Sequence, residues 1–529
     1  MDSQAEQSGQ NNLRWLSGKE YSARRSPTLI ENPQAQLNEK DEVSRYLNSL
    51  EPTYLGQLKG ISNQIAKPMS VNCRLSIGIP AYEEGMNIGK TLELYTKQID
   101  KDGKSINPEL FEITVFDNHP SYVSKDNTKE EVEKFRQAHP EVKIIYVYKQ
   151  WEPQEPATVG NARKHLTDLT LLRSVQREQQ KEELILASND ADTEKIDEHY
   201  VIEIIDAFDK NPKVDALTAK FNYPDWALQK PNLLAASRFW SFMARLVETG
   251  SVGNISERQK EPVGLVGRNA AMRSSIYAAV GGYNSLARNA EDLELGWLIN
   301  DARNWDPQNI IYLNKAEIVS NPRRSLTAIA TKTPVNEMYV DFHKHPEIRT
   351  MNNDQLLALI PDDLDLGQLE AETDSWWQSR TKGEYKYLGS RFEPVFRRAM
   401  RFLGLDFQVV NDHIKITSAD KLMIGISKTF GRDVKVIPKS PSGDIDKPRN
   451  EEKINTYASG LTQGLIETRQ AKATEYSNRI TAVQQGSELI DGDKNRLEFL
   501  KKEYKRFTDE DYDSQKSVNS SDLEEKVKS

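Results

Sequence analysis

The sequence predicts an α/β fold, with a mostly parallel sheet flanked by helices and a mainly helical region after it. Two observations lead to this prediction. Between about residues 73 and 325, short apolar runs alternate with longer amphipathic runs. Such alternation is typical of right-handed βαβ units with strands buried on both faces. Beyond residue 326 the amphipathic runs dominate, so we expect mainly helices there.

The strands and helices of the α/β part follow from this pattern in order. We expect strands at 74–80, 111–118, 142–149, 183–190 and 214–221, and helices at 85–99, 128–140, 161–176 and 195–212. A short amphipathic helix precedes them within 41–70, and "FQVVNDHIKIT" reads as a hairpin further on. We therefore expect four parts: a flexible or helical N-terminal extension (1–70), an α/β domain (71–325), a mainly helical domain (326–440), and a linker, helix and charged tail (441–529).

Composition narrows the class of protein. The chain has 529 residues, 29% of them charged, and a net charge of −9, which argues against general affinity for nucleic acid. No run of 18 apolar residues and no signal-type segment is present, so we expect a cytoplasmic protein without a transmembrane helix. Cys73 is the single cysteine, which excludes an intrachain disulfide and suggests a buried thiol.

Polar and acidic residues follow three of the expected strands. Residues 82–84 (Tyr-Glu-Glu) follow the first, Asp117 ends the second, and Asp190 and Asp192 end the fourth. The carboxyl ends of parallel strands share one edge of the sheet, where ligands bind. Two carboxylates there can hold Mg²⁺ or Mn²⁺ against a diphosphate. The alternative is a turn in which Asp192 or Thr193 caps the next helix.

A second acidic pair stands later in the α/β part. Glu291 and Asp292 open an amphipathic helix within "NAEDLELGWLIND". Acidic residues at a helix start often only offset its dipole. Asp292 could also act as a general base if an acceptor hydroxyl lies beside it. Asp117, likewise, could turn the chain or accept a hydrogen bond from the ring N–H of a bound base.

The order of these segments resembles a family-2-type glycosyltransferase with the GT-A fold. "LSIGIPAYEEGMNIGKTL" resembles the first strand, turn and helix of that family, and "FEITVFDNHP" its second strand. "ATVGNARKHL" resembles its Gly-x-x-x-Ala-Arg-Asn-type helix start, and "LILASNDADT" its Asp-x-Asp strand. "VGRNAAMRSSIYAAVGGYN", "AEDLELGWLI" and "VSNPRRS" resemble its acceptor-side segment, its Glu-Asp motif and its Ser-x-Arg-Arg ending. The resemblance covers about residues 73–325.

The resemblance implies a metal-dependent enzyme that moves a sugar from a UDP- or GDP-type donor to an acceptor hydroxyl, using Mg²⁺ or Mn²⁺. It implies a nucleotide pocket that includes Pro80, Tyr82, Glu84, Asp117 (at the base), Arg163 (near the base or phosphates) and Asp190 (at the ribose and metal). Asp192 would bind the metal. Asp292 would deprotonate the acceptor hydroxyl, and Glu291 would help to position the acceptor.

Some features differ from that family. "DNHP" follows the second strand, and Ser320 and Asn321 stand where many relatives place a metal-binding His, which leaves the third metal ligand open. Retaining relatives share the fold and the Asp-x-Asp, so the stereochemical outcome is open. Two alternatives are a sugar-phosphate nucleotidyltransferase, which would need a glycine-rich basic loop in place of "PAYEEG", and a non-catalytic GT-A scaffold. The acceptor, the oligomeric state and peripheral contact with a membrane are not determined by the sequence.

Overall fold

The computed structural model describes residues 24–120, 126–152, 155–177, 182–233, 265–287, 291–334, 351–381 and 404–419, except 229, 305 and 307, together with residues 235, 348, 397, 400 and 422. The chain divides into two compact units. The first unit contains the described residues up to Tyr223 and those from 265 to 321. The second unit contains the described residues from Pro224 to 235 and those from Pro322 onward. Parts of the mainly helical domain expected at 326–440, and the linker, helix and tail expected from 441, lie outside the described residues.

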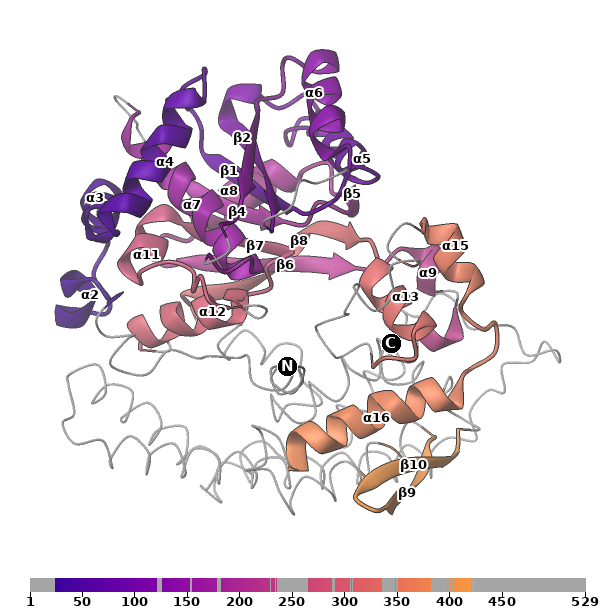
Figure 1. Ribbon diagram of the computed structural model, residues 1–529. Helices are drawn as coiled ribbons and strands as arrows, with labels where there is room; N and C mark the ends of the chain where they lie inside the picture. The colour runs from indigo at the N-terminus through magenta and orange to yellow at the C-terminus, as the bar shows by residue number, and fades with distance from the viewer. Residues whose placement is uncertain are drawn as a thin grey trace. The chain divides into compact units, whose positions relative to one another are not determined.

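An eight-stranded sheet lies at the centre of the first unit (Figure 1). Its order is β3-β2-β1-β4-β7-β6-β8-β5. The pairings β3–β2, β2–β1, β1–β4 and β6–β8 are parallel, whereas β7 and β5 run antiparallel to their neighbours. The α/β class is confirmed, with a sheet of mixed direction. The strands are β1 (Leu75–Ala81), β2 (Phe111–His119), β3 (Ile144–Gln150), β4 (Ile185–Asn189), β5 (Thr193–Ile196), β6 (Ala216–Asn222), β7 (Asn269–Arg273) and β8 (Ile310–Ser320).

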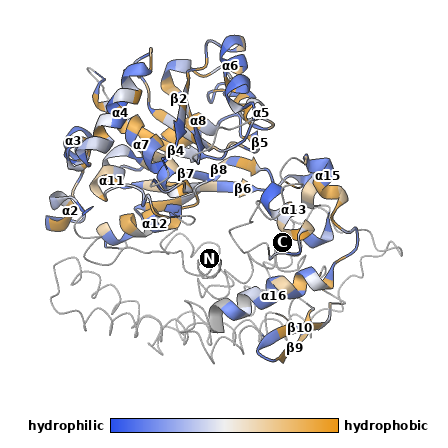
Figure 2. Ribbon diagram, in the orientation of Figure 1, coloured by the Kyte–Doolittle hydropathy of each residue, from blue (hydrophilic) through white to orange (hydrophobic). Residues whose placement is uncertain are grey.

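Helices cover both faces of this sheet and enclose two apolar cores. One core joins α7 and the N-terminal helices to the sheet, and the other joins α5, α6 and α8 to it. Figure 2 shows hydrophobic residues in α12 and parts of α7, and hydrophilic residues over much of α3. The helices are α2 (Pro27–Glu31), α3 (Glu39–Ser49), α4 (Pro52–Gln64), α5 (Ile88–Glu93), α6 (Thr128–Ala138), α7 (Val159–Val175), α8 (Tyr200–Lys210), α11 (Ser274–Ala279) and α12 (Glu291–Ala302), with 3₁₀ turns at Leu94–Lys97 and Pro108–Leu110.

Helix α7 packs closely against β1. Thr158 caps the helix, because its side chain accepts a hydrogen bond of 3.0 Å from the backbone N–H of Asn161. A Cβ atom at Gly78 in β1 would come within 2.7 Å of Leu166 Cδ2 on α7. The glycine therefore allows the close approach that sets the position of α7, which carries Arg163.

The segment after β4 differs from the sequence prediction. We expected a helix over 195–212, with Asp192 or Thr193 as its cap. Instead Thr193 begins β5, which pairs antiparallel with β8, and α8 starts at Tyr200 after His199. The interpretation as a helix cap is wrong because Thr193 lies in a strand. Thr193 and Ile196 are buried, and two buried residues in so short a segment are compatible with a strand as well as with a helix.

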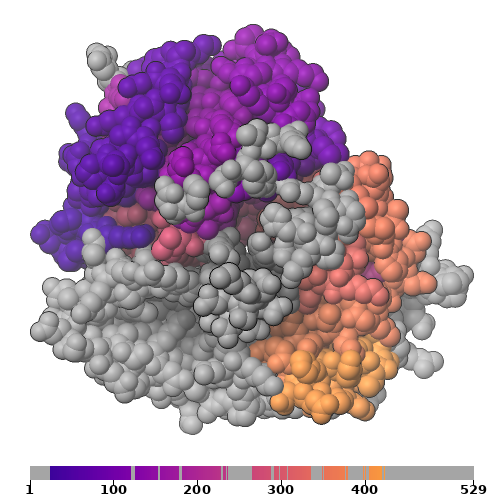
Figure 3. Space-filling view, viewed as in Figure 1, coloured from indigo at the N-terminus to yellow at the C-terminus, as the bar shows by residue number. Residues whose placement is uncertain are grey.

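The N-terminal helices pack into the first unit through a buried carboxylate. Asp168 on α7 is fully buried and accepts hydrogen bonds from the hydroxyls of Tyr46 (2.8 Å), Tyr54 (2.9 Å) and Tyr277 (3.1 Å). Lys164 Nζ adds an ion pair of 2.7 Å. We expected residues 1–70 to be a flexible or helical extension. Within it, helices α3 and α4 pack against the sheet domain, as Figure 3 shows by their indigo surface.

Replacing Asp168 with alanine is expected to lower the free energy of unfolding by about 3–5 kcal/mol. The change leaves the Lys164 ammonium without its counter-ion and three buried hydroxyls without their acceptor. Denaturant unfolding measures the loss. The control is Glu133→Ala on α6, which removes an exposed pair with Arg136 and should change stability by less than about 1 kcal/mol. Equal losses in the two variants would contradict the prediction.

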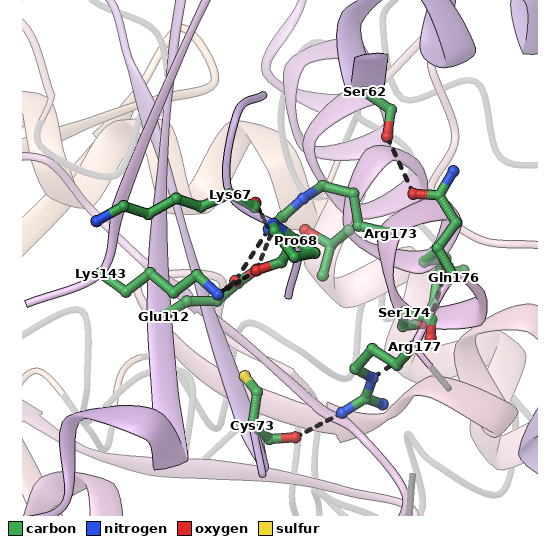
Figure 4. Close-up of polar contacts among 12 residues, drawn as sticks. Ser62, Lys67, Pro68, Cys73, Glu112, Lys143, Arg173, Ser174, Gln176 and Arg177 are labelled. Carbon is green, nitrogen blue, oxygen red and sulfur yellow. Dashed lines mark hydrogen bonds and ion pairs between the residues drawn. The ribbon is translucent and has the colours of Figure 1, made fainter. Parts of the chain in front are cut away.

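A second buried ion pair lies at the amino end of β2 (Figure 4). Glu112 is fully buried and accepts from Arg173 Nη1 at 2.5 Å and Nη2 at 3.2 Å. Lys143 Nζ lies 3.8 Å from the same carboxylate, and Arg173 also donates to the carbonyl of Lys67 at 3.4 Å. This cluster lies at the edge of the sheet opposite to the carboxyl ends of β1, β2 and β4. We therefore assign it a role in stability.

Cys73 lies beside this cluster and is buried, as expected. Burial raises the pKa of its thiol to about 12, and the Glu112 carboxylate adds to the rise. A thiol that is protonated at neutral pH is a poor nucleophile. Cys73 is therefore a core residue, and its backbone carbonyl accepts a hydrogen bond of 2.7 Å from Arg177.

The described part of the second unit contains short helices around a small apolar core, one longer helix and a hairpin. Its described elements are α9 (Asp225–Leu228), α13 (Arg323–Ala330), α15 (Asn353–Ala358), α16 (Leu366–Thr381), β9 (Asp406–Val410) and β10 (His413–Ser418). The expected hairpin is confirmed, and Asn411 and Asp412 take the positive φ angles (50° and 68°) that a tight hairpin turn requires. No described helix combines the length and apolar composition of a membrane span.

Candidate functional site

Aromatic and acidic side chains lie together at the carboxyl ends of β1, β2 and β3. Asp117 is buried; its Oδ2 accepts from the Tyr146 hydroxyl at 2.6 Å, and its Oδ1 lies 2.7 Å from His119 Nε2. The His119 ring lies between the rings of Tyr82 and Tyr148, at centroid distances of 5.4 Å and 5.6 Å. We call these five side chains the aromatic edge.

The aromatic edge presents flat surface to solvent above a buried acceptor. Tyr82 is 38% exposed and Tyr148 is 44% exposed, whereas His119 is fully buried. Burial and the hydrogen bond to Asp117 raise the pKa of Tyr146, so its hydroxyl stays a donor. Both Asp117 oxygens already have one partner, but each carboxylate oxygen can accept a second hydrogen bond. This arrangement can stack a planar ring and accept one of its N–H groups.

The turn after β1 holds Tyr82 in place. Glu83 has a φ of 56°, which is uncommon for a residue with a Cβ. The backbone N–H of Glu84 donates to Thr128 Oγ1 at 2.9 Å, and its side chain accepts from Asn87 Nδ2 at 2.8 Å. Pro80 lies within β1, paired with Phe116, so the strand continues through it to Ala81.

Arg163 on α7 lies at the centre of a second group of predicted residues. Its Nη2 donates to Asp190 Oδ1 at 3.1 Å, and its Nη1 donates to the Gly267 carbonyl at 3.0 Å and to Ser188. Its Nε lies 2.8 Å from Glu291 Oε1, but this N–H does not point at the oxygen. The contact with Glu291 is therefore an ion pair without an aligned hydrogen bond.

Gly267 brings Arg163 and Asp292 close together. A Cβ at this position would lie 3.0 Å from Arg163 Cζ and 3.1 Å from Asp292 Oδ2, so only glycine fits without displacement. The backbone N–H of Gly267 donates to Asp292 Oδ2, and that of Leu293 donates to Oδ1 at 2.8 Å. The carboxylate of Asp292 is thereby fixed at the start of α12.

Glu291, the neighbour of Asp292, is buried. Burial raises the pKa of Glu291 and the carboxylates of Asp292 and Asp190 add to the rise, whereas the Arg163 guanidinium opposes it and favours the charged carboxylate. Among the residues predicted from the sequence, Arg163, Asp190, Glu291 and Asp292 thus form one group, which we call the arginine cluster. Asp117 and Tyr82 belong to the aromatic edge instead.

Asp190 and Asp192 follow β4 on a rigid base. Asn189 is fully buried and is held by Tyr95 (2.6 Å) and Tyr200 (2.8 Å). The backbone N–H of Asn321, at the end of β8, donates to the Asp192 carbonyl at 3.1 Å. These contacts determine where the two carboxylates leave the sheet.

Arg268 lies near these carboxylates. It is a charged residue that the sequence analysis did not predict for the site. Its guanidinium lies over the Phe221 ring at 5.0 Å. Burial acts to lower the pKa of Arg268, but the Tyr223 hydroxyl and the carboxylates of Asp190 and Asp192 outweigh it and raise the pKa. The sequence signal that could have identified Arg268 as a site residue is its position directly after Gly267, in the glycine-containing segment.

A third metal ligand is not evident. Within the described part of the chain, no three acidic, imidazole or thiol side chains gather as a metal-binding group. Ser320 Oγ is buried and lacks a hydrogen-bond partner among the described residues, next to the Asn321 backbone that contacts Asp192. The two carboxylates and nearby oxygens suit a hard cation such as Mg²⁺ or Mn²⁺, which completes its shell with water and phosphate.

Comparison with known proteins gives structural matches only. No protein-family model matches the chain, and no curated protein does. Among solved structures, a mannosyltransferase from Pyrobaculum calidifontis in complex with GDP-Man and Mn²⁺ is similar at 15% identity and a TM-score of 0.32, covering 61% of this chain and 75% of that one. Glucosyl-3-phosphoglycerate synthase from Mycobacterium tuberculosis, in complex with Mn²⁺, UDP-glucose and phosphoglyceric acid, is similar at 14% identity and a TM-score of 0.28, covering 50% and 75%.

Proposed function

We propose that the first unit is a metal-dependent glycosyltransferase that moves a sugar from a nucleotide-diphosphate donor to an acceptor hydroxyl, with inversion. The observation that supports this most directly is the meeting of two strand-end carboxylates, a helix-start carboxylate and two arginines around Gly267. Acids and bases held next to a site for a diphosphate are what sugar transfer needs.

The donor nucleotide would occupy the aromatic edge. Tyr82 and Tyr148 offer exposed rings on which a base can stack, and Asp117 offers an acceptor for a ring N–H. The diphosphate would then lie toward Asp190 and Asp192. Mg²⁺ or Mn²⁺ on these carboxylates supplies positive charge that stabilises the leaving diphosphate. Pro80 and Glu84 shape the turn that carries Tyr82.

Asp292 would act as the general base. The acceptor hydroxyl gives its proton to the Asp292 carboxylate while its oxygen bonds to the anomeric carbon. The bond from that carbon to the diphosphate breaks, and the electron pair leaves with the diphosphate. Arg268, which lies near Asp190 and Asp192, adds charge against the leaving group. Arg163 already has Glu291 and Asp190 as partners, so we assign it a smaller share of that task.

Titration with UDP and GDP, with and without Mn²⁺, tests the proposal. We expect one of the two to bind, with higher affinity in Mn²⁺, and slow release of the diphosphate from the matching nucleotide sugar when water is the acceptor. Absence of binding by both nucleotides would refute the proposal. A nucleotidyltransferase would instead bind a nucleoside triphosphate, for which the "PAYEEG" turn with Glu83 and Glu84 is ill suited.

Replacing Tyr148 with alanine is expected to weaken binding of the nucleoside diphosphate by about 5-fold to 150-fold. Loss of one stacking ring costs about 1–3 kcal/mol per base. Calorimetric titration measures the change. The control is Tyr312→Ala, because Tyr312 is similarly exposed (48%) but lies on β8, away from the aromatic edge. Equal affinities of Tyr148→Ala and the wild type would place the base elsewhere.

A further inference from the structure

Arg163 is a permanent charge inside the site. Its side chain is 6% exposed and that of Glu291 is 5% exposed, whereas Asp190 is 35% exposed. The guanidinium contacts both carboxylates, at 2.8 Å (Glu291) and 3.1 Å (Asp190). Glu291 is therefore the inner partner of Arg163, and Asp190 is the outer partner, which solvent can reach.

The outer partner is the residue that the proposed function gives to the metal. An arginine cannot lose its proton in a protein, so Arg163 competes with any cation for the Asp190 carboxylate. A buried charge without a counter-ion is costly. Arg163 can release Asp190 only if another carboxylate balances it, and Glu291 is the buried carboxylate in contact with it.

We propose that Glu291 is a positioning residue that acts through Arg163: it balances the buried guanidinium and so leaves Asp190 available to a divalent cation. This inference rests on the proposed function, because it takes Asp190 as a metal ligand. Glu291 does not touch the reacting groups in this proposal. The misaligned Nε contact agrees with a partner that provides charge more than a directed hydrogen bond.

Other groups near Arg163 do not replace Glu291. Asp292 lies close to Arg163, but its Oδ2 accepts from the Gly267 N–H and its Oδ1 from the Leu293 N–H. Tyr283 is buried, and burial raises its pKa, so it stays neutral. If Glu291 loses its charge, Arg163 is left mainly with Asp190 on the solvent side. The ion pair between Arg163 and Asp190 then opposes the metal.

The test measures the affinity of the full chain for Mn²⁺ in the presence of the nucleoside diphosphate that the wild type binds. The electron paramagnetic resonance signal of free Mn²⁺ reports how much metal remains unbound. Glu291→Gln should weaken Mn²⁺ binding by about 10-fold, the effect of one close ionic interaction. Glu291→Asp keeps the charge and should remain within about 3-fold of the wild type. The double variant Arg163→Gln, Glu291→Gln should bind Mn²⁺ at least as tightly as the wild type, because it removes the competing cation.

The outcomes separate this inference from the proposed function. If the wild type binds neither UDP nor GDP, the proposed function fails. If the wild type binds Mn²⁺ and Glu291→Gln binds it equally well, the role of Glu291 is overturned. The role is also overturned if the double variant binds Mn²⁺ more weakly than the wild type, because Glu291 would then act by supporting the fold. If Glu291→Gln does not fold, the double variant, in which both partners are neutral, decides by its comparison with the wild type.

Discussion

Asp292→Asn is expected to lower kcat by about 10²-fold to 10⁴-fold, the usual contribution of a general base. The amide side chain has nearly the shape of the carboxylate but cannot take the proton of the acceptor hydroxyl. Binding of the nucleoside diphosphate should stay within about 2-fold of the wild type, because the base acts on the acceptor and lies outside the aromatic edge. Release of the diphosphate from its nucleotide sugar, with water as the acceptor, measures kcat before the natural acceptor is known.

The structure also predicts a stability cost for this change. Two backbone N–H groups, of Gly267 and Leu293, donate to the two oxygens of Asp292. Asparagine has one oxygen, so one of these donors loses its acceptor, at a cost of about 1–3 kcal/mol. Kinetics should therefore be measured well below the melting temperature.

The matched control lies on the same helix. Asp301→Asn near the end of α12 weakens the ion pair with Arg25, away from the arginine cluster, and should leave kcat unchanged. A kcat of Asp292→Asn equal to that of the wild type would exclude Asp292 as the base. The anomeric configuration of the product, read by NMR, provides an independent check. Retention would contradict the single displacement in which Asp292 takes part.

The sequence predicted the elements whose evidence is local. The strands β1 to β4 and β6 are short apolar runs, and their ends carry Tyr82, Asp117 and Asp190 as expected. Thr193 shows where local evidence fails. "TEKI" is compatible with the start of a helix, and only the partner strand β8, more than a hundred residues later in the chain, makes it a strand.

The residues that the sequence reading missed depend on register and tertiary contact. Tyr148 lies opposite Asp117 because β2 and β3 pair in a particular register, which neither strand encodes alone. The contact between Arg163 and Glu291 joins two helices that are far apart in the chain, so no local pattern indicates it. The packing of the N-terminal helices also depends on tertiary contact, because their tyrosine hydroxyls find their acceptor, Asp168, only in the folded unit.

Asp192→Ala is expected to abolish the gain in nucleoside-diphosphate affinity that Mn²⁺ provides. The Asp190 and Asp192 carboxylates both raise the pKa of Arg268, and Asp192 is the residue that the resemblance implies as the metal ligand, so its loss should remove negative charge where a cation would bind. The backbone of residue 192 should keep its place, because its carbonyl accepts from the Asn321 N–H and this bond does not involve the side chain. Titration of the diphosphate in Mn²⁺ and in a chelator gives the metal-dependent gain for each protein.

The affinity of Asp192→Ala for the diphosphate should change differently in the two conditions. In the chelator, Asp192→Ala removes a negative charge that repels the diphosphate, so the metal-free affinity should stay equal or rise. In Mn²⁺ the affinity should fall to the metal-free value. The control Glu198→Ala removes an exposed carboxylate just after β5 and should preserve the full gain. Loss of affinity in both conditions would indicate a damaged fold, and an unchanged gain in Mn²⁺ would exclude Asp192 as a metal ligand. Only a loss confined to Mn²⁺ supports a metal held by Asp192.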